Sequence, residues 1–175
     1  MSVPEATSSR APSPIVSALA WGVPLSVLPS ALWRLAALAG IYGQAHPVTG
    51  AIRPDAGYVV LLSVGSVLTA FLAVGLVRRW GTRWPSWVPG LADRPVPVWL
   101  AVGPAAVGAA FATIVAAYAL INGALHLVPP LNPDRVGMPL EGADLAVVDL
   151  LYSPLLLSGP MLAVVTFDYY RRRTA

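Results

Sequence analysis

The sequence contains no cysteine and no lysine, and it has few charged residues of either sign. Without cysteine, the chain has no disulfide, no thiolate metal ligand, no dithiol redox pair and no thiolate nucleophile. Its 11 basic residues are all arginine. Together with the enrichment in alanine, valine, leucine, glycine and proline, this indicates the codon bias of a GC-rich bacterial genome.

Only 11% of the residues are charged and 57% are hydrophobic, whereas about a quarter of a typical soluble domain is charged. A chain of this composition lacks the polar surface to cover itself in water, so we expect it to reside in a lipid bilayer. Each membrane-spanning helix needs about 20 apolar residues, and 175 residues therefore allow about four spans with short connections.

The familiar catalytic and cofactor motifs are missing from the sequence. It has no phosphate-binding loop, dinucleotide fingerprint, HExxH motif or serine nucleophile elbow, and its two histidines, His46 and His126, lack metal-ligand spacing. We therefore predict no cofactor and no metal site, and we assign no catalytic residue. The arginines cluster at the ends of apolar runs instead of along a polar face, so a nucleic-acid partner is not expected.

Four apolar runs predict an all-α polytopic membrane protein, an antiparallel bundle of four transmembrane helices. The first run is too long for the apolar region of a signal peptide, so we interpret it as a retained helix. Short connections favour packing of consecutive spans. We predict a disordered cytoplasmic tail at 1–13, one transmembrane domain at 14–170 with spans at about 15–42, 57–78, 98–127 and 145–168, and a basic cytoplasmic tail at 171–175.

The arginines predict the orientation of the spans. Eight arginines fall in the N-terminal tail, the second connection and the C-terminus, whereas the first and third connections hold one each, Arg53 and Arg135. The positive-inside rule places the larger group in the cytoplasm. We therefore expect a multi-pass protein of the cell (plasma) membrane with both termini cytoplasmic.

The second connection combines tryptophan with arginine, the side chains that favour the headgroup layer and anionic lipids. One interpretation is a rigid loop that lies on the inner membrane surface, and the other is a docking patch for a cytoplasmic partner or a specific lipid. The predicted membrane-interface residues are Arg78, Arg79, Trp80, Arg83, Trp84, Trp87, Arg94, Trp99, Arg171, Arg172 and Arg173.

The same region carries a resemblance. Pro-Ser-Ala-Leu-Trp-Arg at 29–34, Arg-Trp-Gly at 79–81, Trp-Pro-x-Trp-Val-Pro-x-Leu at 84–91 and Arg-x-Val-Pro at 94–97 precede a Gly/Ala-rich run. This pattern resembles a group of uncharacterised small multi-span bacterial membrane proteins, and the resemblance covers residues 24–125. It implies a fold and a location, but no activity and no functional residue.

A few polar side chains interrupt the apolar runs, and residues of this kind are usually paired or functional in membranes. Comparison of their depths predicts a polar cluster in the outer half of the bundle. Three interpretations stay open: an ion pair between Arg34 and Asp149 that fixes helix register, a pocket in which Arg34 holds an anion and Asp149 or His126 moves a proton, or an Arg34 that extends to the surface alone. The predicted cluster is Arg34, Asn122, His126, Asp149 and Tyr152.

Three functions remain. The favoured one is a structural or accessory subunit, because small-residue helix faces suit contact with a membrane-protein partner or a second copy within the bilayer. The alternatives are a small oligomeric transporter, which needs a carboxylate deep in the membrane, and a membrane-embedded enzyme, which needs an acid–base pair in a pocket. Catalysis is the less favoured interpretation.

Overall fold

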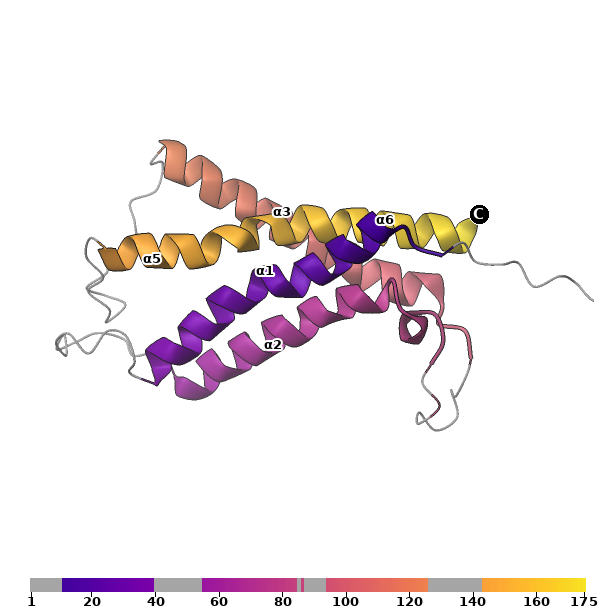
Figure 1. Cartoon of the computed structure of the whole chain (residues 1–175), viewed down its shortest axis with the longest axis horizontal. Coiled ribbons are helices and arrows are strands. Elements are labelled where there is room, and N and C mark those ends of the chain that lie inside the picture. Colours follow the sequence, from indigo (N-terminus) through magenta and orange to yellow (C-terminus); the bar gives the residue numbers. More distant parts are fainter. Residues whose placement is uncertain (1–10, 40–54, 85, 87–93, 126–142) are drawn as a thin grey trace, which may run out of the picture.

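The computed structural model describes residues 11–39, 55–84, 86, 94–125 and 143–175, and this part of the chain is helical without a strand (Figure 1). Four of its helical segments are long and apolar enough to cross a membrane, as predicted: Pro14–Leu38, Ala56–Gly75, Val98–Leu125 and Ala146–Thr174. The elements are α1 (Pro14–Leu38), α2 (Ala56–Gly75), η1 (Arg79–Gly81), α3 (Val98–Leu125), α5 (Ala143–Tyr152), η2 (Ser153–Leu157) and α6 (Ser158–Thr174).

Local signals explain where the first two helices begin. The Ser13 hydroxyl accepts a hydrogen bond from the Val16 amide at 3.3 Å, and the Asp55 carboxylate accepts one from the Gly57 amide at 2.9 Å. Both side chains satisfy amides that have no partner inside the helix. Helix α1 continues through Pro24 and Pro29 without a break, so its two prolines are accommodated within the packed bundle.

The last span consists of three pieces. Pro154 opens the 3₁₀ segment η2, and α6 begins after it. Pro160 is the third residue of α6, where a missing amide proton removes no intrahelical bond. The helix then continues through the terminal arginines to Thr174, whereas the sequence predicted a span that ended at 168 and a separate basic tail at 171–175.

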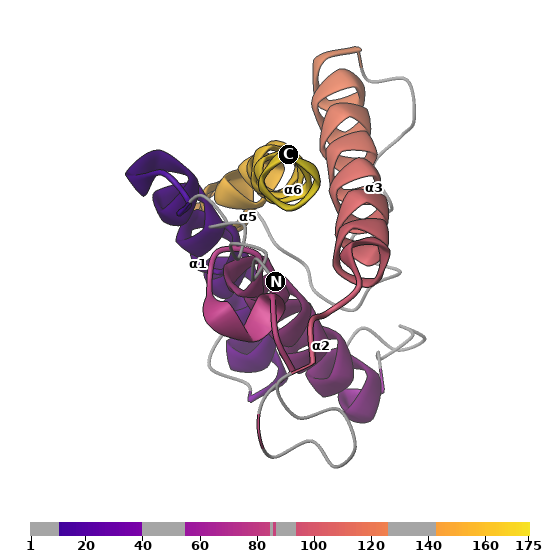
Figure 2. The same cartoon turned by 90° about the vertical axis from the view of Figure 1, so that its right-hand side faces the viewer.

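The spans are arranged in the order α2, α1, α6, α3. Helix α1 packs along both α2 and α6, and α3 lies against α6 and η2 on the other side (Figure 2). Consecutive spans were predicted to pack side by side, and this holds for α1 with α2 and for α3 with α6. Over their described lengths, however, α2 and α3 do not pack along each other.

Small residues allow the closest approaches between helices. A Cβ atom on Gly159 of α6 would lie 2.5 Å from the backbone nitrogen of Thr113 in α3. Ala70 and Ala73 of α2 are buried against Val23 and Val27 of α1. These contacts agree with the close helix packing that small residues permit in membranes.

One end of the molecule holds the start of α1, the turn after α2, the start of α3 and the end of α6 (Figure 1). We call it the arginine end, because seven arginines of the described residues belong to these segments. They are Arg78, Arg79, Arg83, Arg94, Arg171, Arg172 and Arg173. The other end, where α1 finishes and α2 begins, is the opposite end.

Candidate functional site

Arg172 joins α6 to the end of α2. Its Nε atom lies 2.6 Å from the Asp168 carboxylate, which is one helical turn earlier, and its Nη2 atom donates to the carbonyl of Leu76 at 3.0 Å. Leu76 is the C-cap of α2, and carbonyls at a helix end lack intrahelical partners. Arg172 therefore acts as a C-cap for α2, supplied from a helix far away in the sequence.

Arg173 and Tyr169 hold the second connection in the same way. Arg173 donates from Nη2 to the Val96 carbonyl at 2.8 Å, and the Tyr169 hydroxyl donates to the Gly81 carbonyl at 2.9 Å. The Tyr169 ring is fully buried, and the guanidinium carbons of Arg172 and Arg173 each lie 5.9 Å from its centre. These bonds fix the described parts of the connection on the end of α6.

Backbone contacts also close the connection. Trp84 donates its amide to the Arg94 carbonyl at 3.0 Å, and Val96 donates to the Thr82 carbonyl at 3.0 Å. Gly81 lies so close to the end of α2 that an added Cβ atom would overlap the Gly75 carbonyl. The connection is thus a rigid element where it is described, which is what the first of its two interpretations requires.

The remaining arginines at this end are exposed. Arg171 lies over the ring of Phe167, with 5.8 Å between guanidinium carbon and ring centre, and Arg78 lies over Trp21 at 5.9 Å. Within the described residues, no hydrogen-bond acceptor contacts the Arg171 guanidinium. The predicted interface arginines therefore form two groups: Arg172 and Arg173 bond to the backbone of other segments, and the rest are exposed. The predicted interface residue Trp87 lies outside the described residues.

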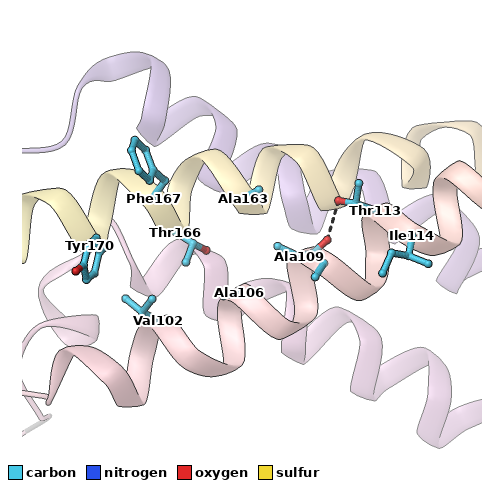
Figure 3. A pocket seen from close by; sticks show the side chains of 10 residues that line it. Val102, Ala106, Ala109, Thr113, Ile114, Ala163, Thr166, Phe167 and Tyr170 are labelled. Atoms are coloured by element: carbon cyan, nitrogen blue, oxygen red, sulfur yellow. Dashed lines mark hydrogen bonds between the residues drawn. The ribbon is translucent and has the colours of Figure 1, made fainter.

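An apolar groove runs along the seam between α3 and α6 (Figure 3). Its volume is about 600 Å³, and it extends from Val102 to Ile114 on α3 and from Ala163 to Tyr170 on α6. The two threonines that line it, Thr113 and Thr166, each donate their hydroxyl to a carbonyl of their own helix at 2.7 Å. The groove therefore presents hydrocarbon to whatever occupies it.

The predicted polar cluster is differently organised. Arg34 donates from Nη2 to the Ser66 hydroxyl of α2 at 3.4 Å, and Ser66 donates to the Ser63 carbonyl at 2.9 Å. Among the described residues, the one ion pair joins Arg172 to Asp168, so Arg34 and Asp149 do not form the ion pair that one interpretation required. Within the same residues, the Arg34 Nε atom and the Ser63 hydroxyl are buried without a hydrogen-bond partner.

The direction of the Arg34 side chain follows from helix geometry. Side chains tilt toward the N-terminus of their helix, and the N-terminus of α1 lies at the arginine end. Arg34 therefore extends inward and meets Ser66, the eleventh residue of the 20-residue helix α2. This position is about half-way along the helix, or about 15 Å from its start at about 1.5 Å per residue.

The other members of the cluster lie on different elements. Asp149 is exposed on α5, Tyr152 is half-buried at the end of α5, and Asn122 is half-buried near the end of α3. His126 lies outside the described residues. No hydrogen bond or ion pair joins Arg34, Asp149 and Tyr152 to one another in the described part of the chain.

The sequence did not indicate which partners the arginines have in the structure. Ser63 and Ser66 stand three residues apart in an apolar run, which places them on one helix face, but serine is common in such runs and gives no specific signal. Asp168 and Tyr169 stand shortly before the three predicted interface arginines, and their place in the sequence gives no sign of their partners. Their bonds join segments that are distant in the sequence.

Within the described residues, no three histidine or carboxylate side chains lie together as a metal site. The four apolar helices define the chain as a multi-pass, all-helical membrane protein. Comparison with known protein families, curated proteins and solved structures found no match. The resemblance to a bacterial group of small membrane proteins therefore stays a prediction.

Proposed function

We propose that the chain is an accessory subunit of a membrane complex, in which α3 receives a transmembrane helix of a partner protein. One observation supports the proposal: α3 packs on α6 through a face of small residues, and this face continues along α3 beyond the part that α6 and η2 cover. Ala109 and Ala116 are buried on this face. Ala119 and Gly123 follow at the same helical spacing, and both are exposed.

Within the described residues, α5, the first part of the last span, does not cover this part of α3. Helix α3 packs against α6 and η2 but does not pack along α5, which forms the other half of the same span in the described residues. The two elements diverge toward the opposite end of the molecule (Figure 1). Among the described residues, no atom outside α3 lies within 4 Å of the position of a Cβ atom on Gly123. Small residues spaced four apart permit close approach of another helix.

The test compares two glycines of α3 with open surroundings. A photo-crosslinking residue in place of Leu120 is expected to give one discrete heteromeric product in native membranes. Gly123→Leu should abolish that product, because the added side chain blocks the approach, whereas Gly103→Leu, which also has no atom within 4 Å of its Cβ position, should preserve it. A crosslinked product that persists in Gly123→Leu would refute this docking face. A product with the mass of two copies of the chain would show that α3 contacts a second copy and not a different protein.

The transporter and enzyme alternatives have no comparable support. A transporter needs a carboxylate that faces the interior of the bundle or a water-filled cavity, and Asp149 is exposed on the surface of α5. An enzyme needs an acid–base pair, and in the described residues Arg34 contacts Ser66 instead of an acid. The accessory role is therefore the function that we propose.

The same proposal includes a location and an orientation. We place the protein in the cell (plasma) membrane of a bacterium, with the arginine end and both termini in the cytoplasm, on the basis of the positive-inside rule. Because the chain has no cysteine, single cysteines can be introduced without background. Cysteine at Ser86 should react with a membrane-impermeant maleimide only after the membrane is opened, and cysteine at Asp55 should react in intact cells. The reverse pattern would invert the topology.

A further inference from the structure

We propose that the groove between α3 and α6 binds one acyl chain of an anionic phospholipid, and that Arg171 binds the lipid phosphate. The observation behind this is a predominantly apolar groove (Figure 3), beside which Arg171 lies over the lining residue Phe167 without a hydrogen-bond acceptor in the described residues. The site is independent of the partner helix proposed above, because Ala119 and Gly123 lie beyond the groove.

The length of the groove suits an acyl chain. Val102 and Ile114 are 12 residues apart on α3, which corresponds to about 18 Å at about 1.5 Å per residue. This length is close to one leaflet of hydrocarbon, which is about 15 Å, half of the core thickness of about 30 Å. An acyl chain that lies along the seam can therefore contact both helices over the whole groove.

The chemistry of the lining agrees with the same occupant. Alanines at 106, 109, 110 and 163 leave the space, and the larger side chains Ile114, Phe167 and Tyr170 border it. The hydroxyls of Thr113 and Thr166 are bonded within their own helices. A polar ligand would therefore lose its hydrogen bonds to water here without replacement, whereas an acyl chain would lose none.

The end of the groove at the arginine end supplies the charge. The exposed guanidinium of Arg171 lies 5.8 Å from the centre of the Phe167 ring, which itself borders the groove. Its two neighbours, Arg172 and Arg173, donate to the Leu76 and Val96 carbonyls. Arg171 is therefore the member of the triplet whose hydrogen-bond donors remain available for a phosphate, and guanidinium binds phosphate through paired donors.

Trp99 extends the site toward the headgroup layer. It precedes Val102 by three residues, so it shares the face of α3 that lines the groove, and 73% of its side chain is exposed. Tryptophan favours the membrane interface. Trp99 therefore adds a side chain that favours the membrane interface at the arginine end of the face that lines the groove.

The experiment measures lipid binding to the purified full-length protein by native mass spectrometry and by thermal shift in detergent. The probes are phosphatidylglycerol, phosphatidylcholine with the same chains, and inorganic phosphate. We expect phosphatidylglycerol to bind about fivefold more tightly than phosphatidylcholine, since one arginine near an anionic headgroup contributes about 1 kcal/mol. Inorganic phosphate is expected to give no shift, because it lacks the acyl chain.

Matched variants assign the two parts of the site. Arg171→Gln should remove the fivefold preference and Arg171→Lys should retain most of it. Ala110→Phe should fill the groove and weaken both lipids, whereas Ala117→Phe, an exposed alanine of α3 outside the groove, should leave both unchanged. Equal binding of the two lipids, an equal shift with inorganic phosphate, an unchanged preference in Arg171→Gln or unchanged binding in Ala110→Phe would each overturn the proposal. A folded Ala106→Leu protein provides the same test if Ala110→Phe does not fold.

Discussion

The arginines at the arginine end and Arg34 inside the bundle carry the same charge in very different surroundings. Arg172 and Arg173 donate to backbone carbonyls at 3.0 and 2.8 Å, and Arg172 also pairs with Asp168. Arg34 makes one hydrogen bond, at 3.4 Å to the Ser66 hydroxyl. In the described residues the Nε atoms of Arg34 and Arg173 are both buried without an acceptor, so the two arginines differ in the acceptor that their Nη2 atoms reach.

The arginines differ because free backbone carbonyls, which can accept hydrogen bonds from arginine, occur at the end of a helix and not in its middle. The last carbonyls of α2 and the backbone of the second connection have no intrahelical partners, so arginines of α6 can satisfy them. In the middle of α2 every carbonyl already accepts a backbone hydrogen bond, and only a serine hydroxyl remains for Arg34. An arginine therefore stabilises the ends of these helices and contributes little in their interior.

The largest expected effect concerns Gly81, on which the closed connection depends. Gly81→Ala places a methyl group on the Gly75 carbonyl, and we expect a loss of about 3 kcal/mol, at the upper end of the usual cost of overpacking. Denaturant unfolding in detergent would measure it. Gly65→Ala is the control, because no atom lies within 4 Å of its Cβ position, and it should be neutral or stabilise by up to about 1 kcal/mol. Equal stabilities of the two variants would contradict the close approach.

A second comparison separates neighbouring arginines. Arg172→Ala should lower the free energy of unfolding by about 2 kcal/mol, because it leaves Asp168 and the Leu76 carbonyl without their charged donor. Arg171→Ala should change stability by less than about 0.5 kcal/mol, as is usual for an exposed side chain. Similar losses in both variants would show that the triplet acts only through its net charge.

A third, smaller effect is expected from Tyr169. Tyr169→Phe retains the buried ring and removes the hydroxyl that donates to Gly81, so we expect a loss of about 1 kcal/mol. Tyr170→Phe at an exposed position should be silent in the same thermal unfolding measurement. A Tyr169→Phe protein as stable as the wild type would mean that water replaces the hydroxyl at no cost.

The smallest effect belongs to Arg34. Arg34→Leu should be neutral or slightly stabilising, because a buried charge with one weak contact can be replaced by an apolar side chain without loss. In a cycle with Asp149→Ala, the two changes should add to within about 0.5 kcal/mol, as expected for residues that share no contact. A coupling above about 1 kcal/mol in detergent would restore the ion pair between Arg34 and Asp149.

Much of the architecture could be predicted, because apolar length and the positions of arginine are properties of single segments. The first three spans begin within one residue of their predicted positions, whereas the last helix continues six residues past the predicted end at 168. The last span was predicted as one run, and the structure has one apolar span there, with a 3₁₀ segment at Ser153–Leu157 that Pro154 opens. The predicted polar cluster depended on which faces of three helices meet, and depth along a helix says nothing about rotation around its axis.

The sequence by itself determined that the described part of this chain forms four helices long and apolar enough to span a membrane, since the cost of burying charge and backbone polar groups in lipid leaves few alternatives. It also determined which helix ends share a side. Only the tertiary structure decided that α3 lies on α6 with its far half uncovered, that Arg172 and Arg173 hold the second connection, and that Arg34 meets Ser66. The physical reason is that side-chain partners depend on helix rotation and neighbour order, which close packing of distant segments sets.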